Sequence, residues 1–233
     1  MVFFRSGPDR LYASLYASDL PEASRVVICP SWGVDMIRSQ GLAHAVARGL
    51  AGSGGAGFVF HWPGHGDSEG MPETATMPRL GDAAVDAVAA ARRMIGGSWG
   101  VLGIGAGAHP ATEAAARGGL PVLLLLQPAV DPAAYFSRVH RAARGASAGW
   151  ALGHPLPEAV RSSASTASDL GEAVSGVRGR KGVIRYALPE PEPAPQGAEV
   201  LTVPGDWRRE AARGHPSLAG AALAWLAGGG EPS

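Results

Sequence analysis

The feature that most constrains the fold is an alternation of short apolar runs with longer, alanine-rich stretches. The apolar runs are typical of buried strands, and the alanine-rich stretches carry apolar residues at helical spacing. Strands are predicted for LYASLY (11–16), RVVIC (25–29), GFVFHW (57–62), WGVLGI (99–104), PVLLLLQ (121–127), GVIRYAL (182–188) and AEVLTV (198–203). Helices are predicted over 38–51, 79–95, 108–119 and 217–227. This order indicates an α/β fold with one doubly wound, mostly parallel sheet covered on both faces.

Composition limits the classes of function. The chain has 233 residues and 46% hydrophobic content, which fits one large domain with a full core. Lys+Arg and Asp+Glu both count 20, so no basic surface for nucleic acid is predicted. Cys29 is the only cysteine, which excludes an intramolecular disulfide and a cysteine-based metal cluster. We therefore expect no metal, no cofactor and no nucleic-acid partner.

No targeting or membrane segment is predicted. The apolar run in MVFFRSGPDR is too short for a signal peptide. No apolar stretch approaches the roughly 18 residues that a membrane span needs. The expected location is the cytoplasm.

A glycine-rich segment at 96–112, GGSWGVLGIGAGAHPAT, raises the question of a nucleophile. Ser98 has the G-x-S-x-G spacing, but it precedes the strand WGVLGI, and ligands bind at the carboxyl ends of parallel strands. We therefore predict that Ser98 is inert. Gly105 follows that strand and opens a helix, which is where a nucleophile elbow would stand. Its neighbours Gly103 and Gly107 suit such a sharp turn, so the geometry is kept and the hydroxyl is missing.

At this point the chain resembles the α/β-hydrolase fold over most of its length. HWPGHGDSEG (61–70) is similar to the loop after the fourth strand of many such hydrolases, and CPSWGVDMIRS (29–39) is similar to their oxyanion loop. Together with LQPAVDPAAYFSRVHR (126–141), LGHPLP (152–157) and VPGDWRREAARGHPSLAGAALAWL (203–226), the latter segment resembles predicted exosortase-system-associated, serine aminopeptidase-like hydrolases. In part of that group the elbow centre is also not serine.

The resemblance implies a single α/β-hydrolase domain over residues 1–233. A lid-like insertion is expected within it at 133–180, where these folds insert a mobile cover. The same segment suits a dimerisation surface equally well, so a homodimer stays open.

The catalytic candidates lie at predicted strand ends. His215 stands where the resemblance puts the general base, although it also reads as a loop residue before a helix that starts with proline. Asp131 follows a strand and could orient that imidazole or act as a base. Its alternative is an N-cap. Other carboxylates that could partner His215 are Glu190, Glu192 and Asp206; the first two lie in a proline-rich loop where many members of the fold keep the triad acid.

The substrate-binding candidates gather around the expected elbow. They are Ser31, Trp32 and Gly33 of the oxyanion-like loop, His61 and Trp62 at the end of a strand, and Gly105 with Ala106. The hydroxyl of Ser31 is expected to face the elbow, but as a nucleophile it would need a base within roughly 3 Å.

Nearby polar residues have simpler roles. His65, Asp67 and Ser68 are expected to stabilise their own loop. His109 is expected to pack against the sheet. Phosphate binding by GIGAGA is disfavoured, because the pattern is G-x-G-x-G and no acidic residue ends a second strand about 20 residues on.

Two functions remain, and the sequence favours the first. It is a cofactor-free enzyme for a small acyl or ester-type substrate, in which His215 and a carboxylate perform acid-base chemistry such as hydrolysis, elimination or cyclisation. The second is a catalytically inactive pseudo-hydrolase that binds an acyl ligand or a partner protein. Fold alone does not decide between them.

Overall fold

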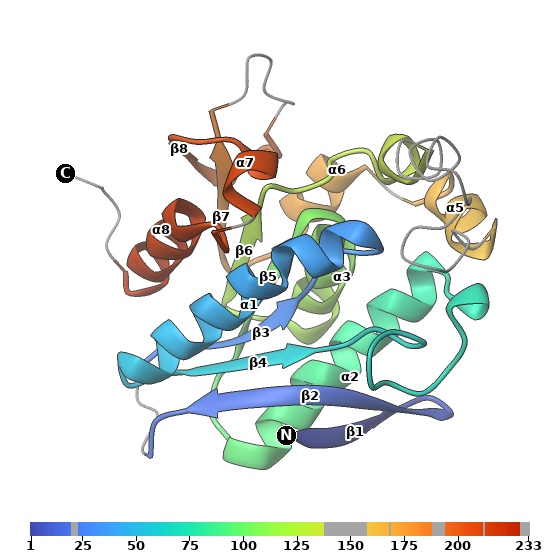
Figure 1. Ribbon diagram of the computed structural model, residues 1–233, viewed down its shortest axis with the longest axis horizontal. Helices are drawn as coiled ribbons and strands as arrows, with labels where there is room; N and C mark the ends of the chain where they lie inside the picture. The colour runs from blue at the N-terminus through green and yellow to red at the C-terminus, as the bar shows by residue number, and fades with distance from the viewer. Residues whose placement is uncertain (20–22, 138–157, 168, 188–193, 212, 229–233) are drawn as a thin grey trace.

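The computed structural model describes residues 1–19, 23–137, 158–167, 169–187, 194–211 and 213–228 (Figure 1). Its centre is an eight-stranded sheet with the order β1-β2-β4-β3-β5-β6-β7-β8. β2 pairs antiparallel with β1 and β4, and all other pairs are parallel. The strands are β1 (Val2–Ser6), β2 (Asp9–Ala17), β3 (Arg25–Cys29), β4 (Ala56–Phe60), β5 (Gly100–Ile104), β6 (Val122–Leu126), β7 (Arg180–Tyr186) and β8 (Glu199–Val203).

Helices cover both faces of this sheet (Figure 1). α1 (Val34–Gly52) and α8 (Pro216–Leu226) pack together on one face, while α2 (Met77–Ile95) and α3 (Ala108–Gly118) pack together on the other. The core is accordingly split in two: in β3, Val26 and Ile28 belong to the first layer, and Val27 and Cys29 belong to the second. This alternation follows from the two-residue period of strand side chains.

Shorter helices follow the ends of the strands. η1 (Pro72–Thr74) and η2 (Gly105–Gly107) are 3₁₀ turns, and α7 (Trp207–Ala211) lies between β8 and α8. α5 (Glu158–Ala164) and α6 (Leu170–Ser175) belong to the predicted insertion at 133–180; α5 packs against η1 and α2, and α6 packs against α3. Residues 138–157 of that segment lie outside the described ranges, as does the motif LGHPLP.

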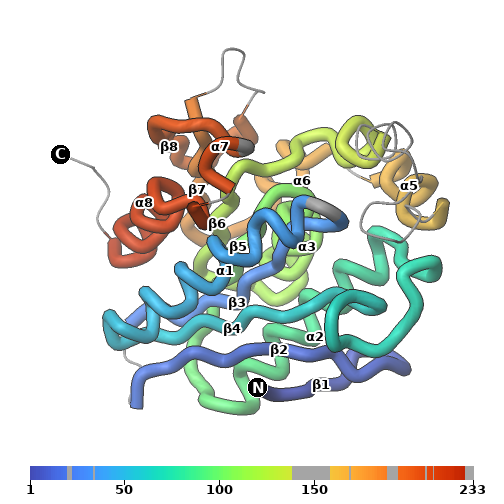
Figure 2. Tube along the Cα trace, in the orientation of Figure 1, coloured from blue at the N-terminus to red at the C-terminus, as the bar shows by residue number. Residues whose placement is uncertain are grey.

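The Cα trace shows α6 beside α3 and α5 farther out, near α2, whereas α7 lies on the other side of the molecule, near β8 and α8 (Figure 2). Within the ranges given above, no helix has the length and apolar character needed to cross a membrane.

Candidate functional site

A sharp turn joins β5 to α3. Gly105 follows the last strand residue, Ile104, and has φ of 56°, a left-handed conformation that glycine adopts without strain. At Gly107, an added Cβ would collide with the backbone carbonyl oxygens of Cys29 and Pro30. Ser98 is exposed and precedes β5, so it lies at the opposite end of the strand from this turn.

The hydroxyl of Ser31 occupies the space beside Gly105. Ser31 is fully buried, and a Cβ built on Gly105 would lie 2.5 Å from its Oγ. The backbone N–H of Ala106 donates a long hydrogen bond of 3.3 Å to the same oxygen. The loop after β3 thus places a hydroxyl in the hollow that a side chain at position 105 would fill.

Two residues that the sequence did not single out hold Ser31 in place. The hydroxyl of Tyr135 donates to the carbonyl of Trp32 at 3.0 Å and to Oδ2 of Asp35 at 3.1 Å. Its oxygen lies 3.4 Å from Oγ of Ser31. Because Tyr135 directs its proton to these acceptors, Ser31 is the donor in that contact. Asp35 also forms an ion pair with Arg38 at 3.2 Å.

His215 lies at the start of α8 with φ of 55°, and its side chain is fully buried. Its Nδ1 is 3.1 Å from the hydroxyl of Tyr186, and its ring stacks on Trp207 with centroids 4.1 Å apart. Burial lowers the pKa of His215, and the Arg38 backbone and the carboxylates of Glu210 and Asp35 oppose that shift. Its Nε2 is buried and forms no hydrogen bond with the described part of the chain.

The candidate carboxylates serve as helix caps. Oδ1 of Asp131 accepts the N–H of Ala134 at 2.8 Å, and Oδ1 of Asp206 accepts the N–H of Arg209 at 3.0 Å. The Nδ1 atom of His215 is hydrogen-bonded to the phenol of Tyr186 instead. Glu190 and Glu192 lie outside these residues. The pairing of His215 with Asp131 therefore stays a prediction.

The residues after β4 separate into two groups. Trp62 is buried, and its Nε1–H donates to the carbonyl oxygens of Pro30 at 3.1 Å and Ser31 at 3.3 Å, so it supports the loop that carries Ser31. The rings of Trp32 and His65 meet edge to face at 4.1 Å.

His61 instead lies against Tyr12, with ring centroids 4.9 Å apart. Its Nδ1 accepts the N–H of Asp67 at 3.4 Å, and the hydroxyl of Ser68 donates to its carbonyl at 2.9 Å. These bonds stabilise the loop: Ser68 acts through its side chain, as expected, and Asp67 through its backbone N–H.

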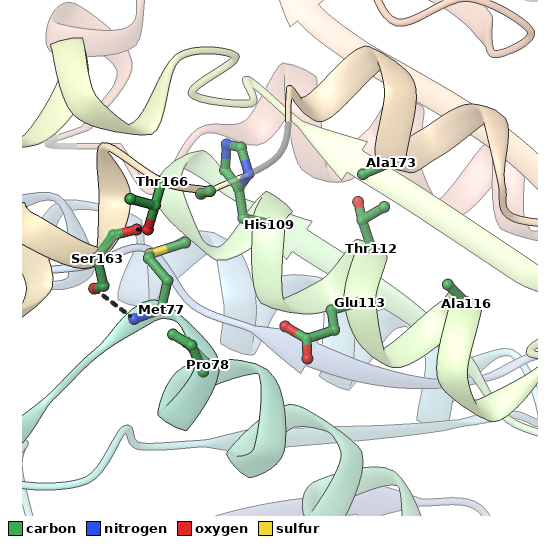
Figure 3. A pocket seen from close by; sticks show the side chains of 10 residues that line it. Met77, Pro78, His109, Thr112, Glu113, Ala116, Ser163, Thr166 and Ala173 are labelled. Atoms are coloured by element: carbon green, nitrogen blue, oxygen red, sulfur yellow. Dashed lines mark hydrogen bonds between the residues drawn. The ribbon is translucent and has the colours of Figure 1, made fainter.

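A hollow of about 400 Å³ lies on the outer side of α3 (Figure 3). It is lined by Met77, Pro78, His109, Thr112, Glu113, Ala116, Ser163, Thr166, Ala167 and Ala173. His109 connects it to the turn: its Nε2 is 2.9 Å from the carbonyl of Ala129, whose N–H donates to the carbonyl of Gly105 at 3.0 Å. Burial lowers the pKa of His109. Among the residues with described positions, no group of three potential metal ligands occurs.

Comparison with solved structures identifies the architecture. Est1E from Butyrivibrio proteoclasticus superposes with a TM-score of 0.70 at 16% identity, covering 97% of this chain and 98% of that one. A thermophilic esterase from Thermogutta terrifontis gives 0.69 at 15% identity, covering 97% of each chain. The protein has the α/β-hydrolase fold.

The enol-lactonase of Burkholderia xenovorans LB400 gives a TM-score of 0.65 at 13% identity and covers 97% of this chain and 99% of that one. No family model matches the chain, and no curated protein matches it significantly in sequence. At identities this low the likeness establishes the fold, and it confirms the predicted doubly wound, mostly parallel sheet.

Proposed function

We propose that this α/β-hydrolase-fold protein binds a small acyl or ester-type molecule and forms no acyl-serine intermediate at its elbow. The observation that carries the proposal is the position of Ser31, whose hydroxyl fills the hollow beside Gly105 and accepts the N–H of Ala106. The ligand class is supported by structures of the same fold: ferulic acid is bound to Est1E, and other neighbours are a lactonase and a thioesterase domain.

The proposal treats Gly105 as the elbow centre. In α/β-hydrolases the N–H of the residue after the nucleophile helps to stabilise the oxyanion. Here that group is on Ala106, and it donates to a hydroxyl of the protein itself. Ser31 does not replace the missing nucleophile, because its oxygen is fully buried and its described partners, the N–H of Ala106 and the phenol of Tyr135, are not bases. A serine hydroxyl without an adjacent base is a weak nucleophile.

A second candidate is the acid-base enzyme in which His215 acts without a covalent intermediate. It is favoured by one observation: Nε2 of His215 is buried and has no well-formed hydrogen bond to the residues that the structure describes, and such atoms in native structures call for an explanation. On this alternative, turnover of an ester depends on His215 and not on any serine.

The test uses fluorophosphonate labelling with mass spectrometry, together with turnover of p-nitrophenyl butyrate. The wild-type chain is expected to show neither label nor turnover, and Ser98→Ala should behave as wild type. Turnover lost in His215→Asn would establish the acid-base enzyme. A label on Ser31 would establish a relocated nucleophile and contradict the proposal.

Substitutions at position 105 give a more specific test of the contact between Ser31 and Gly105. Gly105→Ser is expected to lose roughly 1–2 kcal/mol of stability from its left-handed backbone, with a further cost because its Cβ would meet Ser31 Oγ. Because Ser31→Gly has a cost of its own, that single variant is measured as well, and the double variant should lose less stability in urea unfolding than the sum of the two single losses. Additive losses would contradict the placement of Ser31.

Binding is measured separately as the rise in melting temperature with hexanoate and ethyl hexanoate, because a ligand that binds the folded state raises stability by mass action. A wild-type chain that neither binds these molecules nor turns over esters would contradict the proposed ligand class.

A further inference from the structure

Tyr186 contacts two residues whose backbone conformation is strained. Among the described residues, the non-glycine positions with positive φ are Gln127, at 46°, and His215, at 55°. Such conformations cost free energy and persist where the surroundings fix them, often at functional sites. Both residues contact Tyr186, the last residue of β7: Oε1 of Gln127 accepts its backbone N–H at 3.0 Å, and Nδ1 of His215 lies 3.1 Å from its hydroxyl.

Counting protons decides the direction of the bond between Tyr186 and His215. Both side chains are fully buried, and the described contacts give the Tyr186 hydroxyl one partner, His215 Nδ1. If Nδ1–H donated to the phenol, the phenolic proton and the bare Nε2 would both be left without partners. If the phenol donates to Nδ1, the Nε2–H alone is unsatisfied. Each unsatisfied buried group costs stability, so the second arrangement is favoured.

Two further observations agree with that arrangement. Burial raises the pKa of Tyr186 to about 12, so the phenol keeps its proton. A backbone hydrogen bond between the His215 ring and Arg38 raises the pKa of His215, which favours a proton on Nε2, the ring nitrogen that Tyr186 does not occupy. That contact falls short of good hydrogen-bond geometry, so Nε2 has no well-formed partner among the described residues.

We infer that Tyr186 is the positioning residue of His215: its hydroxyl donates to Nδ1 and fixes the neutral tautomer that carries its proton on Nε2. In a Ser-His-Asp triad the carboxylate accepts from Nδ1–H, which leaves Nε2 free as the base. A phenol in place of the carboxylate donates its proton to Nδ1, so that Nε2 carries the ring proton instead of acting as the base. His215 then holds a hydrogen-bond donor in the protein interior, and once local opening exposes its ring the group it takes is an oxygen acceptor, the carbonyl or carboxylate of the acyl ligand; this last step rests on the proposed function.

The tautomer is measured by ¹⁵N NMR of the ligand-free protein, with His215 assigned from the His215→Asn variant. The wild-type spectrum should show an unprotonated Nδ1, far downfield, and a protonated Nε2. In Tyr186→Phe the Nδ1 resonance should move upfield as the opposite tautomer becomes populated. The matched control is Tyr16→Phe, which removes a hydroxyl 3.0 Å from Nδ1 of His44 and should leave the His215 signals unchanged.

The outcomes distinguish a failure of the tautomer and positioning role from a failure of the proposed acyl-ligand function. A protonated Nδ1 in the wild type overturns the tautomer, and an unchanged His215 signature in Tyr186→Phe overturns the positioning role. Hexanoate is then titrated against hexylamine. A shift of the Nε2–H proton with hexanoate alone supports the acceptor class. A correct tautomer without such a shift contradicts the acyl ligand and leaves the role of Tyr186 standing.

Discussion

In the described part of the chain, two histidines are hydrogen-bonded through Nδ1 to a tyrosine hydroxyl, at nearly the same distance but in different surroundings. The hydroxyl of Tyr16 lies 3.0 Å from Nδ1 of His44, and that of Tyr186 lies 3.1 Å from Nδ1 of His215. The first pair is half-buried on α1 and β2, and the second is fully buried at the start of α8. Water can complete the hydrogen bonds of the first pair in either direction. Burial removes that freedom from the second pair, so the hydrogen bond between its hydroxyl and Nδ1 has one fixed direction.

The backbones of the two pairs also differ. His44 lies in the middle of α1, whereas His215 has a left-handed conformation and stacks on Trp207. Strain and an unsatisfied nitrogen are therefore concentrated at His215. A left-handed backbone and an unsatisfied buried nitrogen each cost stability. Their combination in His215 therefore indicates a role beyond packing.

The largest expected difference between the pairs is chemical access. Diethyl pyrocarbonate reacts with ring nitrogens that water can reach, and His215 becomes reachable only after local opening. We expect His44 to be modified about 100-fold faster, an opening free energy of roughly 3 kcal/mol, as followed by peptide mass spectrometry. Comparable rates at His44 and His215 would show that the region around α8 opens freely and would remove the basis of the comparison.

The second difference is in stability. Tyr186→Phe leaves Nδ1 of His215 buried without a donor, which costs about 1–3 kcal/mol. Tyr16→Phe should cost less than about 1 kcal/mol, because water can replace its hydroxyl. Urea unfolding of both variants measures the two costs under the same conditions. Equal losses would mean that burial does not distinguish the pairs.

The sequence predicted the architecture well because the sheet is built from local patterns. Alternating apolar runs located every parallel strand, and the strand-end rule placed Ser98 and Gly105 at opposite ends of β5. The edge strand β1 was missed, and α1 begins at Val34 rather than at 38. Its N-cap, Gly33, makes no side-chain capping bond, so the sequence carries no start signal there.

The site was predicted less well because its contacts are not local. Tyr186 lies 29 positions from His215, and Tyr135 lies 100 positions from Asp35, so no spacing rule connects them. Tyr186 also reads as an ordinary apolar residue of a buried strand. The sequence predicts a carboxylate partner for His215, whereas the structure places a phenol at its Nδ1.

The smallest difference is the response of the two pairs to pH and salt. Burial lowers the pKa of both histidines, with Arg48 and His61 lowering that of His44 further, while Glu210 and Asp35 partly oppose the shift at His215. As the pH falls below about 6.5, the unfolded chain takes up these protons and the folded chain does not, so stability is lost.

We therefore expect His215→Asn and His44→Gln each to reduce the loss of unfolding free energy between about pH 7.5 and 5.5, by at most about 1.4 kcal/mol. Asparagine suits the left-handed backbone at 215. Added salt separates the two residues. The charge of Arg48 near half-buried His44 is screened by salt, whereas the desolvation of His215 is not. Raising the ionic strength should shrink the His44 contribution by a few tenths of a kcal/mol, whereas that of His215 should hold or grow slightly, because salt weakens the opposing attraction of Glu210 and Asp35. Equal salt sensitivity would mean that charge rather than burial governs both pairs.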